Sequence, residues 1–129
     1  MWKLKADDRV VHWRDFRKTI GALPLEKSLE EAAKFWHTCP FVPYYLDPDR
    51  PENWPDPWTL IYDNTFCDLA KALGIIYTMS LTDHKNLDPE IRIYDDKKTG
   101  LRYNLACFCK GKYILNLIDS EVVNIEKLD

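Results

Sequence analysis

The chain has 129 residues, a formal net charge of −3, 46% hydrophobic residues and 13% aromatic residues. The aromatic content separates it from disordered chains, and the slightly acidic charge gives no electrostatic reason to bind nucleic acid or an anionic membrane. No apolar run is long enough to span a bilayer, and no apolar signal segment follows the N-terminal methionine. We therefore expect a single cytoplasmic domain over 1–129, made of a helical part (1–39), a loop (40–58) and a helix with a sheet (59–129).

The first 39 residues have the spacing of two helices. Apolar side chains recur at helical intervals in the first stretch: Val10, Trp13, Phe16 and Ile20. Gly21 follows the last of these and ends the first predicted helix. Ser28 and Glu31 have the spacing of a capping box, so a second helix is predicted to begin at Ser28 and to end before Pro40.

Residues 40–58 hold six of the eight prolines, interleaved with aromatic side chains. Proline removes an amide donor and fixes φ, so we expect an ordered loop that wraps the core without regular helix or central strand. Rigid aromatic rings suit protein contact, because they bring apolar area with little entropy to lose. The alternative is that they only cap the core. The candidate binding residues are Tyr44, Tyr45, Trp54 and Trp58.

The last part predicts a short third helix followed by an antiparallel sheet. Asp63, Asn64 and Thr65 are cap-type residues, and Gly74 is a left-handed stop, which together bound a helix that carries Cys67. The expected fold class is α+β, with N-terminal helices and an antiparallel sheet packed on the Cys67 helix. Compact turns separate the expected strands, which lie at 75–81, 91–94, 101–109, 112–117 and 121–125.

Cys67 is the first candidate for chemistry. It falls in the opening turn of the third predicted helix, where free amides and the positive end of the helix dipole favour a thiolate. A nucleophilic thiol also needs a base. Without one, Cys67 is a small buried side chain, which is the common role of free cysteine.

The segment from Asn64 to Ile75, followed by the expected strand, resembles the nucleophile helix of the transglutaminase-like superfamily, which is related to papain-like enzymes. The resemblance covers about half of the chain and implies a histidine base and then an acid on later strands. Tyr103 stands at the implied base position, or Asn104 if the register shifts by one, and Asn116 stands at the implied acid position. The resemblance implies acyl transfer or amide hydrolysis through a thioester as the family reaction.

This reaction lacks its base here, because a phenol with an ordinary pKa near ~10 does not take a thiol proton efficiently at neutral pH. We therefore expect a non-catalytic, structural or protein-interaction role, with a protein partner or larger assembly and no cofactor. The chain also resembles small bacteriophage proteins, which implies the host cytoplasm or a virion. Two alternatives stay open: a Cys67-dependent amide hydrolase or acyltransferase with a base from elsewhere, and a small-ligand sensor whose pocket is lined by Trp58 and Tyr103.

The histidines and the other cysteines are further candidates. His12, His37 and His84 could supply a base only if the fold brings one of them to Cys67. A metal could in principle use His37 with Cys39, Cys107 and Cys109. Two cysteines one residue apart on a strand point to the same face and do not surround an ion, so we expect packing there and no metal.

Overall fold

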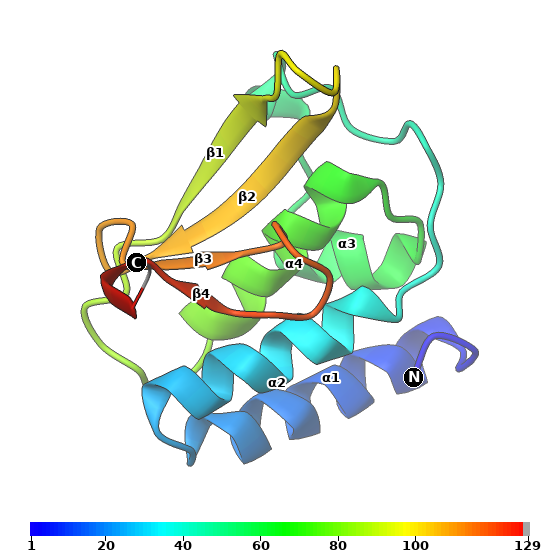
Figure 1. Ribbon diagram of the computed structural model, residues 1–129. Coiled ribbons are helices and arrows are strands. Elements are labelled where there is room, and N and C mark those ends of the chain that lie inside the picture. The colour runs from blue at the N-terminus through cyan, green and yellow to red at the C-terminus, as the bar shows by residue number, and fades with distance from the viewer. Residues whose placement is uncertain (128–129) are drawn as a thin grey trace.

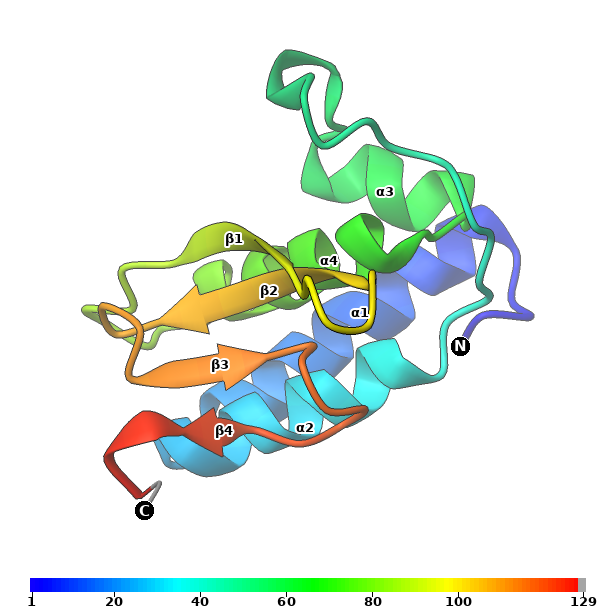
Figure 2. The ribbon, with the colours of Figure 1, turned by 45° about the horizontal axis from the view of Figure 1, so that its top comes forward.

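Helix α4 (Asp68–Ser80) lies at the centre of the computed structural model, which describes residues 1–127 (Figure 1). Eight of its thirteen residues are buried, so it is enclosed on several sides and not only along one stripe. Helices α1 (Ala6–Gly21), α2 (Leu25–His37) and α3 (Pro57–Asp63) contact it. Strands β1 (Glu90–Asp95) and β2 (Arg102–Phe108) cover it from the other side. Figure 2 shows these two layers.

The sheet is antiparallel and its strands follow chain order. The strands are β1 (Glu90–Asp95), β2 (Arg102–Phe108), β3 (Tyr113–Leu115) and β4 (Val123–Asn124). Single 3-10 turns lie at Pro51–Asn53 and Ile125–Lys127. On β2, Ala106 and Phe108 belong to the main core, and Asn104 shares their face because side chains alternate along a strand. The predicted α+β class with an antiparallel sheet is confirmed.

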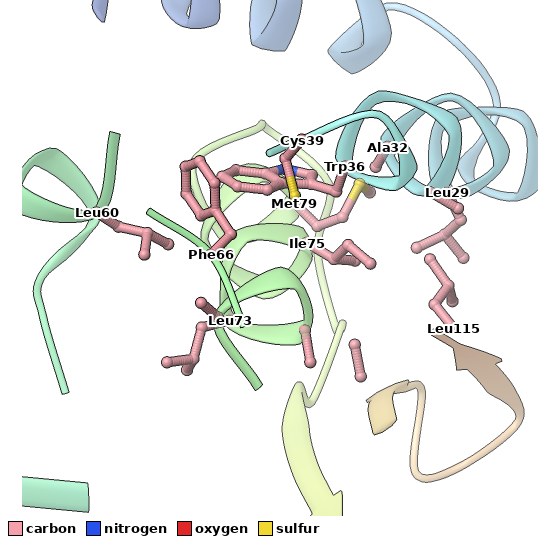
Figure 3. Close-up of a cluster of buried hydrophobic side chains, with 14 of the residues drawn as sticks. Leu29, Ala32, Trp36, Cys39, Leu60, Phe66, Leu73, Ile75, Met79 and Leu115 are labelled. Carbon is pink, nitrogen blue, oxygen red and sulfur yellow. The ribbon is translucent and has the colours of Figure 1, made fainter. Parts of the chain in front are cut away.

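Close contact between α2 and α4 depends on Trp36 and Gly74. A Cβ built on Gly74 would lie 2.5 Å from the nearest atom of the Trp36 ring, so only glycine allows the ring to lie on the helix backbone. Figure 3 shows Trp36 in this core, between Cys39 and Met79. Rings from the N-terminus and from Phe66 enclose it on further sides.

Thr78 links three helices through one hydroxyl group. Its Oγ1 accepts hydrogen bonds from the indole Nε1 of Trp13 (3.0 Å) and of Trp36 (2.8 Å), and donates to the carbonyl of Gly74 (2.7 Å). All three side chains are fully buried. Since a buried indole N–H without a partner is costly, this shared acceptor fixes how α1 and α2 pack on α4.

Two sequence predictions about the central helix are wrong. The helix does not stop at Gly74, and residues 75–81, predicted as a strand, form its last turns and its C-cap. The β-branched and aromatic composition of this stretch favours a strand, but Ile75, Thr78 and Met79 bury at helical spacing against α1 and α2. Tertiary packing therefore overrides the local preference.

The predicted capping box is also wrong. Helix α2 starts at Leu25, after Pro24, which places Ser28 one turn inside the helix. The Ser28 amide already donates to the carbonyl of Pro24 (2.9 Å), and its buried hydroxyl contacts the sulfur of Met79 (3.7 Å). A serine with a helical partner for its amide and a buried side chain is a packing residue.

Helix α3 was not predicted, because its start lies inside the Pro-rich stretch. Asp56 is its N-cap and accepts a hydrogen bond from the Thr59 amide (2.8 Å), and Pro57 occupies the first turn, where its missing N–H costs nothing. Asp63 and Asn64, predicted to open the next helix, end this one instead, with Asn64 in the left-handed conformation (φ 53°).

A buried arginine holds the end of α3 against α1. Arg9 is 8% exposed, and its guanidinium donates to the carbonyls of Ile61 (3.1 Å) and Tyr62 (2.8 Å) and to that of Leu4. The last carbonyls of a short helix have no partners within the helix. Arg9 supplies the missing donors, and these hydrogen bonds hold the short helix against α1.

Candidate functional site

The thiol of Cys67 lies at the start of α4 and is enclosed. Cys67 is the N-cap residue of α4, and only 4% of its surface is exposed. The Pro-rich segment runs beside it, since the Val42 amide donates to the Phe66 carbonyl (2.9 Å) and Phe41 forms a parallel bridge with Phe66. In the part of the chain that the structure describes, the Cys67 side chain takes part in no hydrogen bond.

The polar groups at this helix end bind one another. Both oxygens of the Asp68 carboxylate are used: Oδ2 accepts from the Asn104 backbone amide (3.2 Å) and side-chain amide (3.0 Å), and Oδ1 accepts from Asn116 Nδ2 (3.1 Å). Asn116 Nδ2 also donates to the carbonyls of Asp68 (3.2 Å) and Asn104 (2.9 Å). These three residues form the amide cluster, which ties α4 to β2 and to the end of β3.

Asn116 reaches this cluster through an uncommon backbone conformation. It follows β3 with a φ of 67°, a left-handed conformation that asparagine adopts more readily than most residues. Asn104 is 7% exposed, and its Oδ1 has no hydrogen-bond partner among residues 1–127. The fold therefore brings two of the implied site residues to the N-terminal end of α4, which we call its head: Asn104, at the shifted base position, and Asn116, at the acid position.

Tyr103 is placed differently. It is opposite Tyr94 in the register of β1 and β2, and the two rings stack with centroids 6.2 Å apart. Because Asn104 faces α4, the neighbouring Tyr103 side chain lies on the other face of the sheet. The Asn104 side chain is therefore the one that bonds to the helix, whereas Tyr103 only borders the pocket beside it.

A pocket of about 230 Å³ opens beside the amide cluster. Its lining includes His37 from the end of α2, Asp68 and Lys71 from α4, Tyr103, and Asn116. This volume is below the ~300 Å³ at the lower end of small-molecule sites. Trp58, expected to share a pocket with Tyr103, lines a separate one with Tyr62.

Two ionisable groups that interact electrostatically with Cys67, Cys39 and Tyr45, cannot accept its proton at neutral pH. Burial raises the pKa of Cys39 to about 11, and the charge of Cys67 adds to this increase. Burial and the hydrogen bond to Asp63 raise the pKa of Tyr45 to about 12, again with a contribution from Cys67. Both groups are protonated at neutral pH, so neither can take the thiol proton. Of the histidines, His37 alone lines the adjacent pocket in the described residues.

The four aromatic residues predicted for binding divide into two pairs. Tyr44 and Trp58 are 95% and 47% exposed. Tyr45 and Trp54 pack against the core and are anchored, since the Tyr45 hydroxyl donates to Asp63 (2.7 Å) and Trp54 Nε1 donates to the Asp47 carbonyl (2.9 Å).

Sequence reasoning missed two further exposed rings, Phe41 and Tyr62, both 59% exposed. Tyr62 was hidden because helix α3 itself was not predicted. We call Phe41, Tyr44, Trp58 and Tyr62 the aromatic face.

The remaining cysteines are free in the described residues, and burial raises the pKa of Cys107 and of Cys109. Cys109 lies beyond the end of β2 with a φ of 56°, so these two thiols do not share one strand face. Across residues 1–127, no group of three or more His, Cys, Asp and Glu side chains is arranged to hold a metal ion. In the same residues, none of the helices combines the length and apolarity that crossing a bilayer requires.

The chain shows no match to any protein-family model, to any curated protein or to any solved structure.

Proposed function

We propose that this chain is a non-catalytic protein-binding domain that works in a larger assembly, such as a phage virion, on a transglutaminase-like fold. The order of elements supports the fold proposal: a helix with Cys67 at its start packs on an antiparallel sheet, and residues from two successive strand regions reach that start. At the base position of such a site this chain carries Tyr103, or Asn104 in the shifted register, and at the acid position it carries Asn116, so neither position holds a histidine. An asparagine amide does not accept a thiol proton.

The aromatic face is the observation that carries the binding part of the proposal. It presents four large rings to solvent on one loop and one short helix. The Tyr45–Asp63 hydrogen bond joins the two segments one residue away from Tyr44 and one residue away from Tyr62. Exposed tyrosine and tryptophan on a fixed backbone lose little entropy on binding and are the side chains enriched at hot spots.

The backbone of this region is fixed by several polar anchors. The Tyr77 hydroxyl donates to the Pro55 carbonyl (2.6 Å), which ties the loop to α4, and the Asp56 cap fixes the start of α3. Backbone amides from α3 lower the pKa of Asp56, so the cap is ionised at neutral pH. A preformed surface of this kind suits binding without a large rearrangement.

A capture experiment tests the proposal. Immobilised chain is incubated with extract of the native source, and bound proteins are compared between wild type and a Tyr44→Ser/Tyr62→Ser variant. We expect one partner whose recovery falls to less than about a tenth in the double variant, because hot-spot rings contribute ~2 kcal/mol each. Tyr94→Ser is the matched control, since Tyr94 is 53% exposed but lies on β1. If every captured protein binds the double variant as well as wild type, the proposal is wrong.

One observation favours a second candidate, a Cys67-dependent amide hydrolase or acyltransferase. His37 and Asn116 line the same pocket at the head of α4, so an imidazole is near the thiol-bearing helix. This candidate requires His37 to reach the Cys67 sulfur. No hydrogen bond between them exists in the described residues, and Cys67 is absent from the pocket lining.

A further inference from the structure

A third cavity, of about 430 Å³, lies between the C-terminal ends of α1 and α4. Three cationic side chains of α1 line it, Arg14, Arg17 and Lys18, and Asp83 is the carboxylate in its lining. The two segments approach closely here, since a Cβ on Gly21 would lie 3.6 Å from the side chain of Thr82. The cavity is large enough for a small anionic group and part of the molecule that bears it.

Arg17 lies over two indole rings, and no carboxylate in residues 1–127 pairs with it. Its guanidinium carbon lies 4.4 Å from the Trp13 ring centroid and 5.3 Å from that of Trp58, so two indoles support the same cation. In the described residues no carboxylate lies within 4.0 Å of Arg17, and its buried Nε has no hydrogen-bond partner. Burial and then the charge of Arg14 lower the pKa of Arg17.

The terminal carbonyls of the helices do not use the hydrogen-bond donors of these cations in the described residues. Cations near the C-terminus of a helix are favoured by its dipole, which explains why they are tolerated here. However, none of the three cations donates to a terminal carbonyl in the described part of the chain, and Arg14 has only an exposed contact with Asp15 (3.4 Å). Their donors therefore remain available to a ligand.

We propose that this cavity is a binding site for a phosphate monoester. The lining carries three cations and the carboxylate of Asp83, and Asp15 pairs with Arg14 beside it, so a net positive charge remains. A monoester has three strongly accepting terminal oxygens, one for each of the three cationic side chains. The planar guanidinium of Arg17, fixed by two rings, presents the fork of N–H donors that phosphate oxygens accept. A carboxylate or a phosphodiester presents only two charged oxygens and leaves one of the three cations without an oxygen of its own. The site is separate from the amide cluster, and it does not depend on the proposed protein-binding function, although Trp58 of the aromatic face is one of the rings under Arg17.

The test is a titration followed by nuclear magnetic resonance. The Arg17 Nε–H signal and the amide signals of Gly21 and Thr82 are recorded while O-phosphoserine or inorganic phosphate is added at constant ionic strength. We expect saturable 1:1 shifts with both probes. An Arg14→Gln/Lys18→Gln variant, which spares the packed Arg17, is expected to bind at least about tenfold more weakly, because it loses two charge-assisted contacts.

Two controls decide the outcome. Lys97→Gln/Lys98→Gln changes the net charge equally at the β1–β2 turn and is expected to bind within about twofold of wild type. Acetate and dimethyl phosphate, each with one negative charge, are expected to bind more weakly. Shifts that never saturate, equal weakening in the two double variants, or equal affinity for the singly charged probes would each overturn the proposal.

Discussion

Replacing Gly74 with alanine is expected to destabilise the fold by about 3 kcal/mol or more, at the upper end of overpacking costs. The added Cβ would lie 2.5 to 2.6 Å from three atoms of the Trp36 ring. The ring cannot move aside easily, because its Nε1 is bonded to Thr78 and the rings of Trp2 and Phe66 pack against it. Urea unfolding followed by tryptophan fluorescence measures the change in the free energy of unfolding.

Gly21→Ala is the matched control for this change. Gly21 is also helical, but its Cβ would make an ordinary contact of 3.6 Å with Thr82. Removing a glycine from a helix without a clash stabilises by roughly 0.4–1 kcal/mol. The two substitutions are therefore expected to have opposite signs. Similar small effects at both positions would show that the contact between Trp36 and α4 is looser than described.

Replacing Thr78 with valine is expected to cost about 2–5 kcal/mol, although valine has nearly the same shape. The hydroxyl accepts from two buried indoles, and each N–H left without a partner costs ~1–3 kcal/mol. The effect should appear in the denaturant midpoint, with a change in the fluorescence of the folded state because both indoles lose their acceptor.

Thr19→Val separates this effect from the general cost of losing a helical threonine hydroxyl. Thr19 Oγ1 donates to the Asp15 carbonyl (3.0 Å), four residues earlier, as Thr78 Oγ1 does to Gly74. Thr19 is exposed and accepts from no indole, so its replacement should change stability by less than about 0.5 kcal/mol. Equal losses at the two positions would contradict the role of Thr78 as a shared acceptor.

The strongly periodic parts of the sequence predicted their elements correctly. The apolar stripe with Trp13 and Ile20 lies on α1, and the predicted strands at 91–94 and 101–109 correspond to β1 and β2. The later strands exist but are shorter than predicted, since β3 and β4 hold three and two residues. Period and turn residues are local properties, and these elements depend mainly on them.

The full length of the central helix could not be predicted from local sequence properties. Gly74 has the residue type of a helix stop, but its role depends on Trp36, which lies far away in sequence and close in space. The following β-branched residues favour a strand in isolation, but packing against α1 and α2 buries them in a helix. Helix α3 did carry a local signal, since Asp56 followed by Pro57 is typical of a helix start. The many prolines before it favoured a loop prediction instead.

The candidate site was predicted in part. The sequence placed Cys67 at a helix start and Asn116 beside it, and both lie at the head of α4. It did not indicate Asp68 as the centre of the cluster, because a first-turn carboxylate is common in helices and its two asparagine partners come from distant segments. The face of Tyr103 depends on the strand register, and a shift of one residue reverses it.

The reactivity of Cys67 tests most directly whether the head of α4 is a binding scaffold and not a catalytic centre. Native protein is treated with iodoacetamide at pH 6, and each cysteine is followed by peptide mass spectrometry, in wild type and in His37→Gln. The structure predicts that Cys67 reacts more slowly than free cysteine in both proteins and reaches the free rate only in denaturant. Labelling faster than free cysteine at pH 6, lost in His37→Gln, would show an imidazole-activated thiol and contradict the account.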